Sequence, residues 1–303
     1  MNACSIKELS ISYGETPALR NISLAIPQGE IYGIIGPDGA GKTTLMRALC
    51  TLLPYQHGSI EVLDLHTVKD EKNIRARLGY MPQRFSLYQD LSVQQNLMFF
   101  AKLFGVKEKE YRKRLAELYQ FSRLEPFNKR RAGDLSGGMK QKLALSCALI
   151  HTPELIILDE PTFGVDPVSR IEFWNILHEL KAEGIGIIVS TPYMDEAEQC
   201  DTVALIHKGQ ILDIGKPGDL LAAWPFKLYT VNGSDLAEIR AFLAAQPEIN
   251  NLQLFGSEIH ISSNEEISSD TFAAWMQQCV SLKQWKAISP GMEDVFLEMM
   301  SHD

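Results

Sequence analysis

Short apolar runs alternate with helical patterns from the N-terminus to about Leu220. The run IYGIIG at 31–36 is followed closely by the helical pattern KTTLMRALCTLL at 42–53. The runs LIILDE at 155–160 and GIIVST at 186–191 have the same character, and each precedes a polar or helical segment. This alternation predicts an α/β fold, with a mixed or largely parallel sheet and helices on both faces.

A mostly helical stretch lies between these strands, from about Leu91 to His151. In its opening residues, Ser92-Val-Gln-Gln95, Ser92 fits an N-cap and Gln95 is placed to bond back to the N-cap backbone. We therefore expect a helical subdomain at about residues 84–151, inside a larger domain that spans residues 1–222.

The pattern changes beyond the segment 220–225, which we interpret as a domain boundary. A strand, a helix, two strands, a helix, a strand and a terminal helix are expected in turn, the first six in FKLYTV, DLAEIRAFLAAQ, NNLQLF, EIHIS, TFAAWMQQCV and KQWKAI. The order β-α-β-β-α-β is typical of a small ferredoxin-like sandwich of the split βαβ type. Residues 223–303 are thus predicted to form an accessory C-terminal α+β domain.

Composition and charge argue against some functions. The chain has 303 residues, of which 45% are hydrophobic and 22% are charged, and its net charge is −9. From Pro225 onward, four basic residues stand against eleven acidic ones, a balance of −7. Because phosphate backbones need a basic surface, no nucleic-acid partner is expected.

The sequence also predicts a cytoplasmic protein that reaches a membrane only through a partner. No apolar run approaches the roughly 20 residues of a spanning helix, and the N-terminus lacks the pattern of a secretion signal. Five scattered cysteines without a CxxC pair favour reduced thiols over a disulfide framework or a zinc site.

Residues 36–44 read GPDGAGKTT and match the phosphate-loop pattern G-x-x-x-x-G-K-[ST] in full. Glycines let the backbone turn so that consecutive N–H groups point at phosphate oxygens, and the helix that follows adds its positive end. Lys42 would reach the β- and γ-phosphates, and the Thr43 hydroxyl is placed to bind Mg²⁺. The predicted nucleotide-binding residues are Gly36, Pro37, Asp38, Gly39, Ala40, Gly41, Lys42, Thr43 and Thr44.

Four further segments make the chain resemble the ABC (ATP-binding cassette) ATPases. Gln83 in GYMPQ resembles the Q-loop glutamine, LSGGM at 135–139 the signature, and LIILDE at 155–160 the Walker B strand with its adjoining glutamate. FGVD at 163–166 is similar to the D-loop, in which the family more often has Ser and Leu in place of Phe and Val. The segments occur in the family's order, over about residues 5–220. The resemblance implies an ATPase with ATP and Mg²⁺ as cofactors.

This resemblance also implies roles for single side chains. Asp159 would hold the Mg²⁺ shell, and Glu160 would polarise the attacking water as the general base. Gln83 would contact Mg²⁺ or the water, with an ordinary surface glutamine as the alternative. Tyr13 fits the aromatic ring that stacks on adenine, and its alternative is a packing role.

The signature implies a second ATPase subunit. Its serine and glycines open a predicted helix and would form another small anion cradle. By resemblance, this cradle caps the γ-phosphate that the other subunit binds, so that two subunits enclose two ATP molecules head to tail. A homodimer is favoured over a heterodimer. The residues expected at this contact are Leu135, Ser136, Gly137, Gly138 and Met139, and Asp166 is the D-loop carboxylate.

The chain departs from the family at the switch position. In STPYMDEAE, the histidine that contacts the γ-phosphate is replaced by Pro192, which offers neither a side-chain donor nor a backbone N–H. Thr191 is a possible substitute. Two interpretations remain: hydrolysis is slower but real, or this site is weak and the signature serves a better site on another subunit. The intact Lys42, Asp159 and Glu160 favour the first.

The remaining motifs concern the type of ABC protein. A single ATPase domain favours a transport subunit over a translation factor or a repair ATPase. SPGMEDVFLEMM at 289–300 and the string YMDEAEQCD are similar to ATPases of bacterial multidrug-type and ABC-2 exporters, so export is favoured over uptake. The expected protein lies on the inner face of the cell membrane, bound to a separate integral membrane permease. It could also be one half of a tandem protein, or a regulatory nucleotide-binding subunit held inactive by Pro192.

The segment after Gln83 is rich in apolar and aromatic residues. Phe85, Leu87 and Tyr88 are candidates for a groove that receives a coupling helix of the membrane subunit, and core packing is the alternative.

Overall fold

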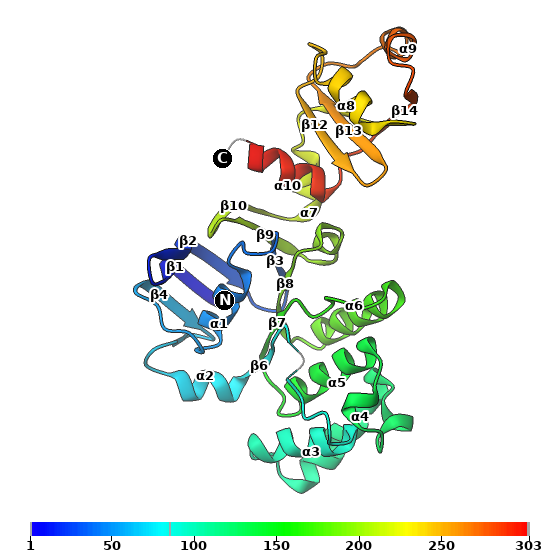
Figure 1. Ribbon diagram of the computed structural model, residues 1–303. Helices are drawn as coiled ribbons and strands as arrows, with labels where there is room; N and C mark the ends of the chain where they lie inside the picture. Colours follow the sequence, from blue (N-terminus) through cyan, green and yellow to red (C-terminus); the bar gives the residue numbers. More distant parts are fainter. Residues whose placement is uncertain (1, 85, 302–303) are drawn as a thin grey trace. The chain divides into compact units, whose positions relative to one another are not determined.

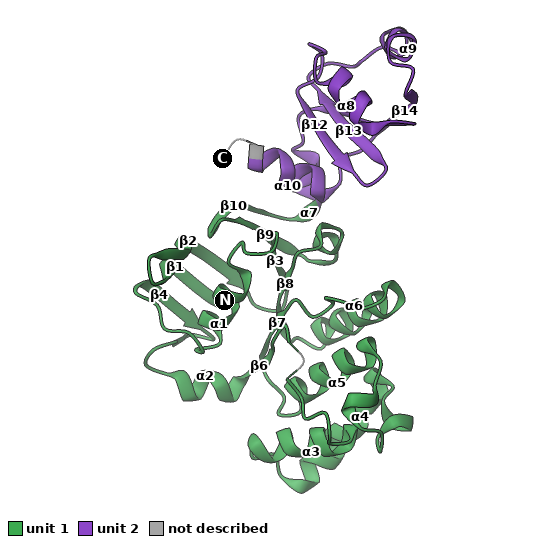
Figure 2. Ribbon diagram, in the orientation of Figure 1, with its two compact units in different colours: residues 1–217 green, residues 218–303 purple. Residues whose placement is uncertain are grey.

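The computed structural model describes residues 2–84 and 86–301, and the chain divides into two compact units (Figure 2). The first unit comprises residues 1–217 and the second comprises residues 218–303. Each unit has its own hydrophobic core. Among the described residues, no helix combines the length and the apolar character needed to cross a bilayer.

The first unit is built on a six-stranded sheet in the order β10-β9-β3-β8-β7-β6 (Figure 1). All neighbours pair in parallel except β9 and β10, which are antiparallel. Every residue of β3, β7 and β8 is buried, which confirms the interpretation of the apolar runs as central strands. The strands are β3 (Ile31–Ile35), β6 (Leu78–Met81), β7 (Leu155–Asp159), β8 (Gly186–Thr191), β9 (Thr202–His207) and β10 (Gln210–Gly215).

Helices cover both faces of this sheet, as predicted. Figure 1 shows α1 (Lys42–Leu49) on one face, with α5 (Gly137–Leu149) and α6 (Pro167–Ala182) on the other. The helix predicted at 42–53 ends at Leu49, because Cys50 caps it and Thr51 adopts the left-handed region at φ 59°.

A second, antiparallel sheet in the order β2-β1-β4-β5 completes the first unit, and the sequence analysis did not predict it. Its apolar residues alternate along the strands and join α1 in one core, with Leu9 and Ile60 fully buried. The short helix α2 (Glu71–Arg77) connects β5 of this sheet with β6 of the main sheet, and a second short helix, α7 (Pro217–Ala222), follows β10. The strands are β1 (Asn2–Tyr13), β2 (Thr16–Pro27), β4 (His57–Val62) and β5 (Leu65–His66).

The stretch between β6 and β7 is helical, as expected. It consists of α3 (Val93–Leu103), α4 (Glu108–Ser122), two 3₁₀ turns, η1 (Glu125–Phe127) and η2 (Ala132–Asp134), and α5. The capping box at the start of α3 is confirmed: the Ser92 hydroxyl accepts from Gln95 N, and the Gln95 side chain accepts from Ser92 N.

The second unit has the element order β11, α8, β12, β13, α9, β14, α10, around an antiparallel sheet in the order β12-β13-β11-β14. One sheet face packs on α8 and α9, with Ile259, Ile261 and Phe272 fully buried. His260 lies on the other face, where its Nδ1 is 2.7 Å from Asp294 Oδ1 of α10. The elements are β11 (Lys227–Gly233), α8 (Leu236–Leu243), β12 (Asn251–Phe255), β13 (Glu258–Ser263), α9 (Ser269–Gln278), β14 (Leu282–Ile288) and α10 (Met292–Ser301).

Candidate active site

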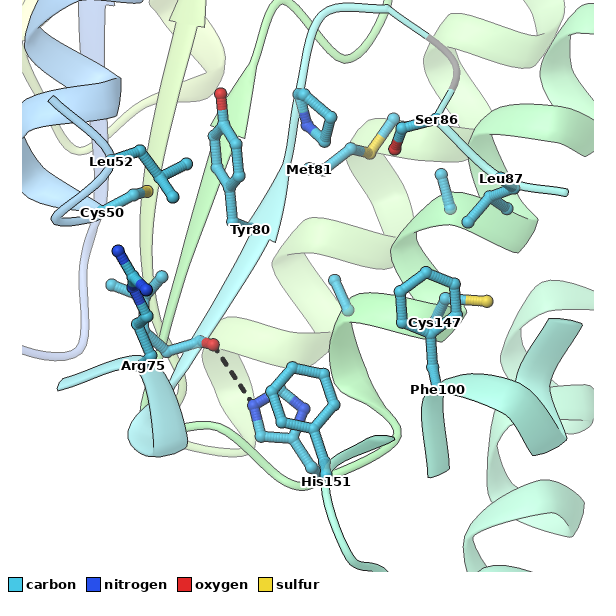
Figure 3. Close-up of a pocket in the computed structure, with 15 residues that line it drawn as sticks. Cys50, Leu52, Arg75, Tyr80, Met81, Ser86, Leu87, Phe100, Cys147 and His151 are labelled. Carbon is cyan, nitrogen blue, oxygen red and sulfur yellow. Dashed lines mark hydrogen bonds between the residues drawn. The ribbon is translucent and has the colours of Figure 1, made fainter. Parts of the chain in front are cut away.

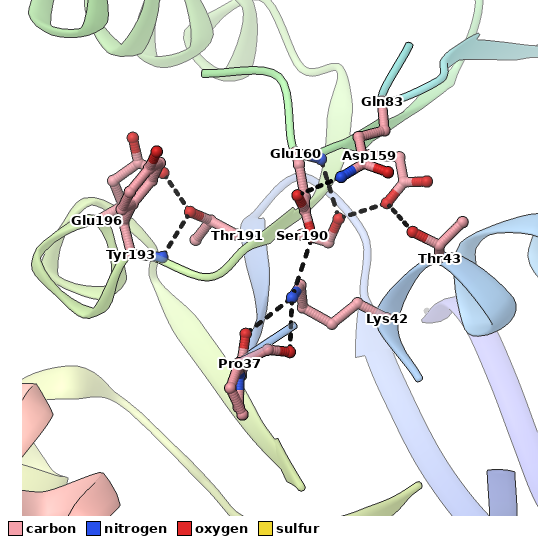
Figure 4. A network of polar contacts seen from close by, with 11 residues as sticks. Pro37, Lys42, Thr43, Gln83, Asp159, Glu160, Ser190, Thr191, Tyr193 and Glu196 are labelled. Atoms are coloured by element: carbon pink, nitrogen blue, oxygen red, sulfur yellow. Dashed lines mark hydrogen bonds and ion pairs between the residues drawn. The ribbon is translucent and has the colours of Figure 1, made fainter. Parts of the chain in front are cut away.

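Four neighbouring strands of the main sheet carry the candidate site at their carboxyl ends. In the order β3-β8-β7-β6, these strands run in parallel, so that their carboxyl ends meet at one edge. Lys42 follows β3, Ser190 lies near the end of β8, Glu160 follows β7 and Gln83 follows β6. The site thus joins segments that are far apart in the sequence (Figure 4).

The loop between β3 and α1 needs its glycines for two different reasons. Gly39 and Gly41 adopt φ values of 77° and 107°, in the left-handed region that favours glycine. Gly36 is required by space instead, because a Cβ there would lie 2.2 Å from the carbonyl oxygen of Ile206. Ala40 and Thr44 are buried beneath the loop, whereas Pro37 is partly exposed and Asp38 is exposed.

The Lys42 side chain is almost completely buried, at 3% exposure. Its ammonium donates to the carbonyl oxygens of Gly36 at 2.8 Å and Pro37 at 3.0 Å, and lies 3.0 Å from Glu160 Oε1. Glu160 is equally buried, at 4% exposure. The two opposite charges therefore compensate each other in an environment with little water.

Asp159, at the end of β7, is 1% exposed, and of its two carboxylate oxygens only Oδ1 accepts hydrogen bonds from the described residues. Oδ1 accepts from the hydroxyls of Thr43 at 3.1 Å and Ser190 at 2.8 Å. Oδ2 is buried and has no hydrogen-bond partner among the described residues. Burial raises the pKa of Asp159, and the hydrogen bonds from Ser190 and Thr43 partly oppose the rise. An unpaired buried carboxylate oxygen beside a hydroxyl fits a hard divalent cation.

Glu160 is held at both its backbone and its side chain. Its φ of 49° is unusual for a residue other than glycine, and its N–H donates to the carbonyl oxygen and hydroxyl of Ser190 at 3.1 and 3.0 Å. Its Oε2 accepts from Gln83 Nε2 at 2.7 Å. Gln83 is therefore not an isolated surface glutamine, although much of the residue is exposed.

The hydroxyl of Thr191, the possible substitute for a histidine at position 192, forms hydrogen bonds within its own segment. It donates to Glu196 Oε2 at 2.5 Å and accepts from Tyr193 N at 3.1 Å. Figure 4 shows this side chain directed at Glu196, within the segment that follows Pro192. The single proton of the hydroxyl is thus used there.

Arg170 of α6 anchors the same segment, which forms the 3₁₀ helix η3 (Met194–Gln199). Its guanidinium contacts Glu196 Oε1 at 3.0 Å and Asp195 at 3.3 Å, and its Cζ lies 4.3 Å from the ring centroid of Tyr193. Glu196 is 3% exposed, so this pair neutralises a buried charge. Ser190, Arg170 and Glu196 were not predicted from the sequence, although Ser190 and Glu196 lie within the string STPYMDEAE.

The signature lies apart from this cluster and packs on the D-loop and α6. Ser136 is the N-cap of α5 and accepts from Met139 N at 3.4 Å, and Leu135 is buried. A Cβ on Gly138 would lie 2.5 Å from the Ser169 hydroxyl, and one on Gly137 would lie 3.8 Å from the Gly164 carbonyl oxygen. Within one chain, the hydrogen bonds recorded for residues 135–139 do not reach the loop at 36–44.

The other two predicted residues lie in exposed positions. Asp166 is the N-cap of α6, and the hydrogen bond from Ser169 N, 3.0 Å long, lowers the pKa of its carboxyl group. Tyr13, at the end of β1, is 50% exposed, so its ring is not part of the core.

An apolar cavity of about 230 Å³ lies between the main sheet and the helical stretch (Figure 3). Leu87 lines it and is buried, while Tyr88 is half exposed and packs edge-on against Phe99 at 4.6 Å. Phe104 stacks on His151 at its wall, with ring centroids 3.8 Å apart. Phe85, the other groove candidate, lies outside the described residues.

Comparisons with known sequences agree with the resemblance. Residues 19–163 match the family described as ABC transporter. The probable multidrug ABC transporter ATP-binding protein YbhF of Escherichia coli K12 is 38% identical over 291 residues, which are 94% of this chain but 50% of YbhF. This chain thus spans half the length of that relative.

Two relatives of similar length also match. The linearmycin resistance ATP-binding protein LnrL of Bacillus subtilis is 31% identical over 95% of both chains. The Nod factor export ATP-binding protein I of Rhizobium etli is 30% identical over 100% of this chain and 95% of its own length.

Solved structures share the fold. CbiO1 from Clostridium perfringens, described as part of the ABC transporter complex cbiONQ, has a TM-score of 0.68 and 30% identity over 73% of this chain and 91% of its own. The dimeric post-hydrolysis state of the ATP-binding cassette MJ0796 bound to ADP and Pi has a TM-score of 0.65 and 26% identity, covering 70% and 98% of the two chains.

Because Arg170 anchors the segment at 193–199 that contains η3, we expect Arg170→Ala to lower the stability strongly. Removing the guanidinium leaves Glu196 buried without its cation, so the free energy of unfolding should fall by about 3 kcal/mol. Arg112→Ala is the control, because Arg112 forms an exposed pair with Glu108, and it should change the value by less than about 0.5 kcal/mol. Chemical denaturation measures both. Equal losses in the two variants would contradict the anchoring role.

Proposed function

The chain belongs to the family of ABC transporter ATP-binding proteins, and on this premise we propose that it hydrolyses Mg-ATP to power export by a membrane transporter. The observation that carries the proposal is the cluster of Lys42, Glu160, Asp159 and Gln83 at the carboxyl ends of four adjacent strands. A buried cation and two buried carboxylates, with an amide bonded to one of them, are groups that phosphoryl transfer to water needs.

The nucleotide would be bound by the loop at 36–44. Its backbone N–H groups and the N-terminus of α1 would face the phosphates, and Lys42 would exchange contacts with its own loop and Glu160 for phosphate oxygens. The Tyr13 ring is exposed enough to stack on the adenine. Thr43, Asp159 and Gln83 would hold Mg²⁺, which when bound neutralises charge on the phosphate oxygens.

Glu160 would act as the general base on the attacking water. In the structure its carboxylate is bonded to Lys42 and Gln83, so it is held inside the site but is not free. Release of Lys42 toward the nucleotide would also release one oxygen of Glu160. Binding would thereby prepare the base, and chemistry would require the nucleotide to be in place.

A second ATPase subunit would complete the site. The signature, Leu135 to Met139, packs on the D-loop and α6 of its own chain, and Ser136 is the N-cap of α5. We propose that it caps the γ-phosphate bound by the other subunit, with Asp166 at the same contact. A homodimer is favoured, because each chain carries both halves of the site.

The partner in the membrane would be a separate permease, which would hold this chain at the cytoplasmic face. The apolar cavity lined by Leu87, Phe100 and Phe104 offers a groove for a helix of that subunit. Export as the direction is supported by the names of the relatives, which include multidrug, linearmycin resistance and Nod factor export proteins.

The two units would have different roles. We propose an ATPase domain at 1–222, with its helical subdomain at 84–151, and an accessory domain at 223–303. The strand order and the order of elements in residues 227–288 support a ferredoxin-like sandwich for the latter. Residues 225–303 carry most of the net negative charge of the chain, −7 of −9.

Pro192 supports a second candidate, a catalytically weak subunit that binds nucleotide and pairs with a more active ATPase. The observation that favours it is that the Thr191 hydroxyl donates to Glu196, so this hydroxyl is not available in place of the histidine. The intact Lys42, Asp159 and Glu160 favour hydrolysis by this chain itself.

Steady-state ATPase turnover over a range of protein concentrations tests the proposal. Turnover per chain should rise with concentration, because the complete site needs two chains, and Glu160→Gln should lower it by at least about 100-fold. The surface variant Glu108→Gln on α4 serves as the matched control and should retain wild-type turnover. Turnover that Glu160→Gln does not change would refute hydrolysis at this site.

Pro192→His tests whether the missing histidine limits the rate. An imidazole at this position should raise kcat several-fold, since a positioned donor beside the γ-phosphate stabilises charge in the transition state. Pro192→Ala removes the proline without adding a donor and should leave kcat unchanged. If both variants raise kcat equally, backbone stiffness rather than the absent side chain limits turnover.

A further inference from the structure

Ser190 occupies a central place in the site although no motif pointed to it. It is the fifth residue of β8 and pairs with Asp159 of the neighbouring strand β7 in the parallel register. The residue is completely buried, at 0% exposure. A buried hydroxyl must satisfy its hydrogen bonds locally, so its partners define what it does.

The hydroxyl of Ser190 bridges the two carboxylate residues. Because a carboxylate without a proton can only accept, the hydroxyl donates to Asp159 Oδ1 at 2.8 Å. Because an amide N–H can only donate, the same oxygen accepts from Glu160 N at 3.0 Å. Thr43 also bonds Asp159 Oδ1, but its recorded hydrogen bonds do not include Glu160.

We propose that Ser190 is the positioning residue that orients the two adjacent carboxylates for different roles, Asp159 for the cation and Glu160 for the water. This proposal rests on the proposed hydrolysis of ATP. Binding Oδ1 of Asp159 leaves Oδ2 as the oxygen available to a cation. Binding the N–H of Glu160 holds that residue at its φ of 49°, which places its side chain against Lys42 and Gln83.

The two effects predict a specific pattern for Ser190→Ala. Asp159 would keep only the Thr43 bond and could rotate, so the affinity for Mg²⁺ should fall. Glu160 would lose one of the two acceptors of its N–H, so kcat should fall as well. Binding of ATP without a metal depends on the loop at 36–44, so it should stay unchanged. If Ser190 had only a structural role, Ser190→Ala would lower the stability without this specific loss of Mg²⁺ affinity and kcat.

The experiment measures ATP binding by calorimetry in EDTA and over a Mg²⁺ titration, together with kcat, KM and thermal unfolding. Ser190→Ala should raise the Mg²⁺ concentration at half-saturation by about tenfold or more, as the loss of groups that orient metal ligands does elsewhere. Ser190→Thr keeps the hydroxyl and should restore the Mg²⁺ dependence. Ser122→Ala removes another buried hydroxyl, bonded to Leu118 O in α4, and should change only stability.

Two results would overturn the proposal. One is wild-type Mg²⁺ dependence and kcat in Ser190→Ala, and the other is a loss of stability alone, matching that of Ser122→Ala. Failure of the proposed function is distinguishable, because it would appear as absent turnover in the wild-type chain. The Mg²⁺ titration of ATP binding would still decide the role of Ser190 in that case.

Discussion

The buried ion pair between Lys42 and Glu160 joins the loop after β3 to the end of β7, and the geometry of the site depends on it. Both side chains are almost without exposure, so each charge would be costly without the other. The carbonyl oxygens of Gly36 and Pro37 and the amide of Gln83 complete their hydrogen bonds. Because the polar groups of Lys42 and Glu160 have these partners, the loop is held in its conformation without nucleotide.

The parallel order of the strands explains why the other groups of the site lie beside this pair. Parallel strands bring their carboxyl ends to one edge of the sheet, so residues distant in sequence can meet only there. β8 lies between β3 and β7, and it supplies Ser190 to the gap between the loop and the carboxylates. The same strand leads into the segment that contains η3, and Arg170 of α6, the helix after the D-loop, binds this segment through Glu196. The site and the proposed subunit contact are thereby linked through α6.

Local signals in the sequence were enough to predict the central strands, the phosphate loop and the capping box at Ser92. Each depends on residues close together in the chain. In the N-terminal antiparallel sheet, the pairing of β1 with β4 spans the β3–α1 segment and leaves no local pattern, whereas β1 and β2 form a local hairpin whose short connection was overlooked. Ser190 was missed because its role depends on the register of β8 against β7.

In the second unit, the string SPGMEDVFLEMM gains a physical explanation that resemblance alone did not provide. Asp294 accepts from the N–H of Gly291 at the start of α10 and bonds to His260 on β13. The helix is thus capped and fixed to the sheet by one carboxylate. Such a contact joins elements 34 residues apart, so only the folded structure could assign it.

A mixing experiment tests most directly the central claim, that a functional site combines the phosphate loop of one chain with the signature of another. Lys42→Ala removes the phosphate contact and Ser136→Glu places a carboxylate where the γ-phosphate would be capped, so each variant alone should lack ATPase activity. A mixture of the two should regain turnover, because each mixed dimer contains one site with both halves intact. Absence of turnover in a mixture that still forms dimers would contradict the account.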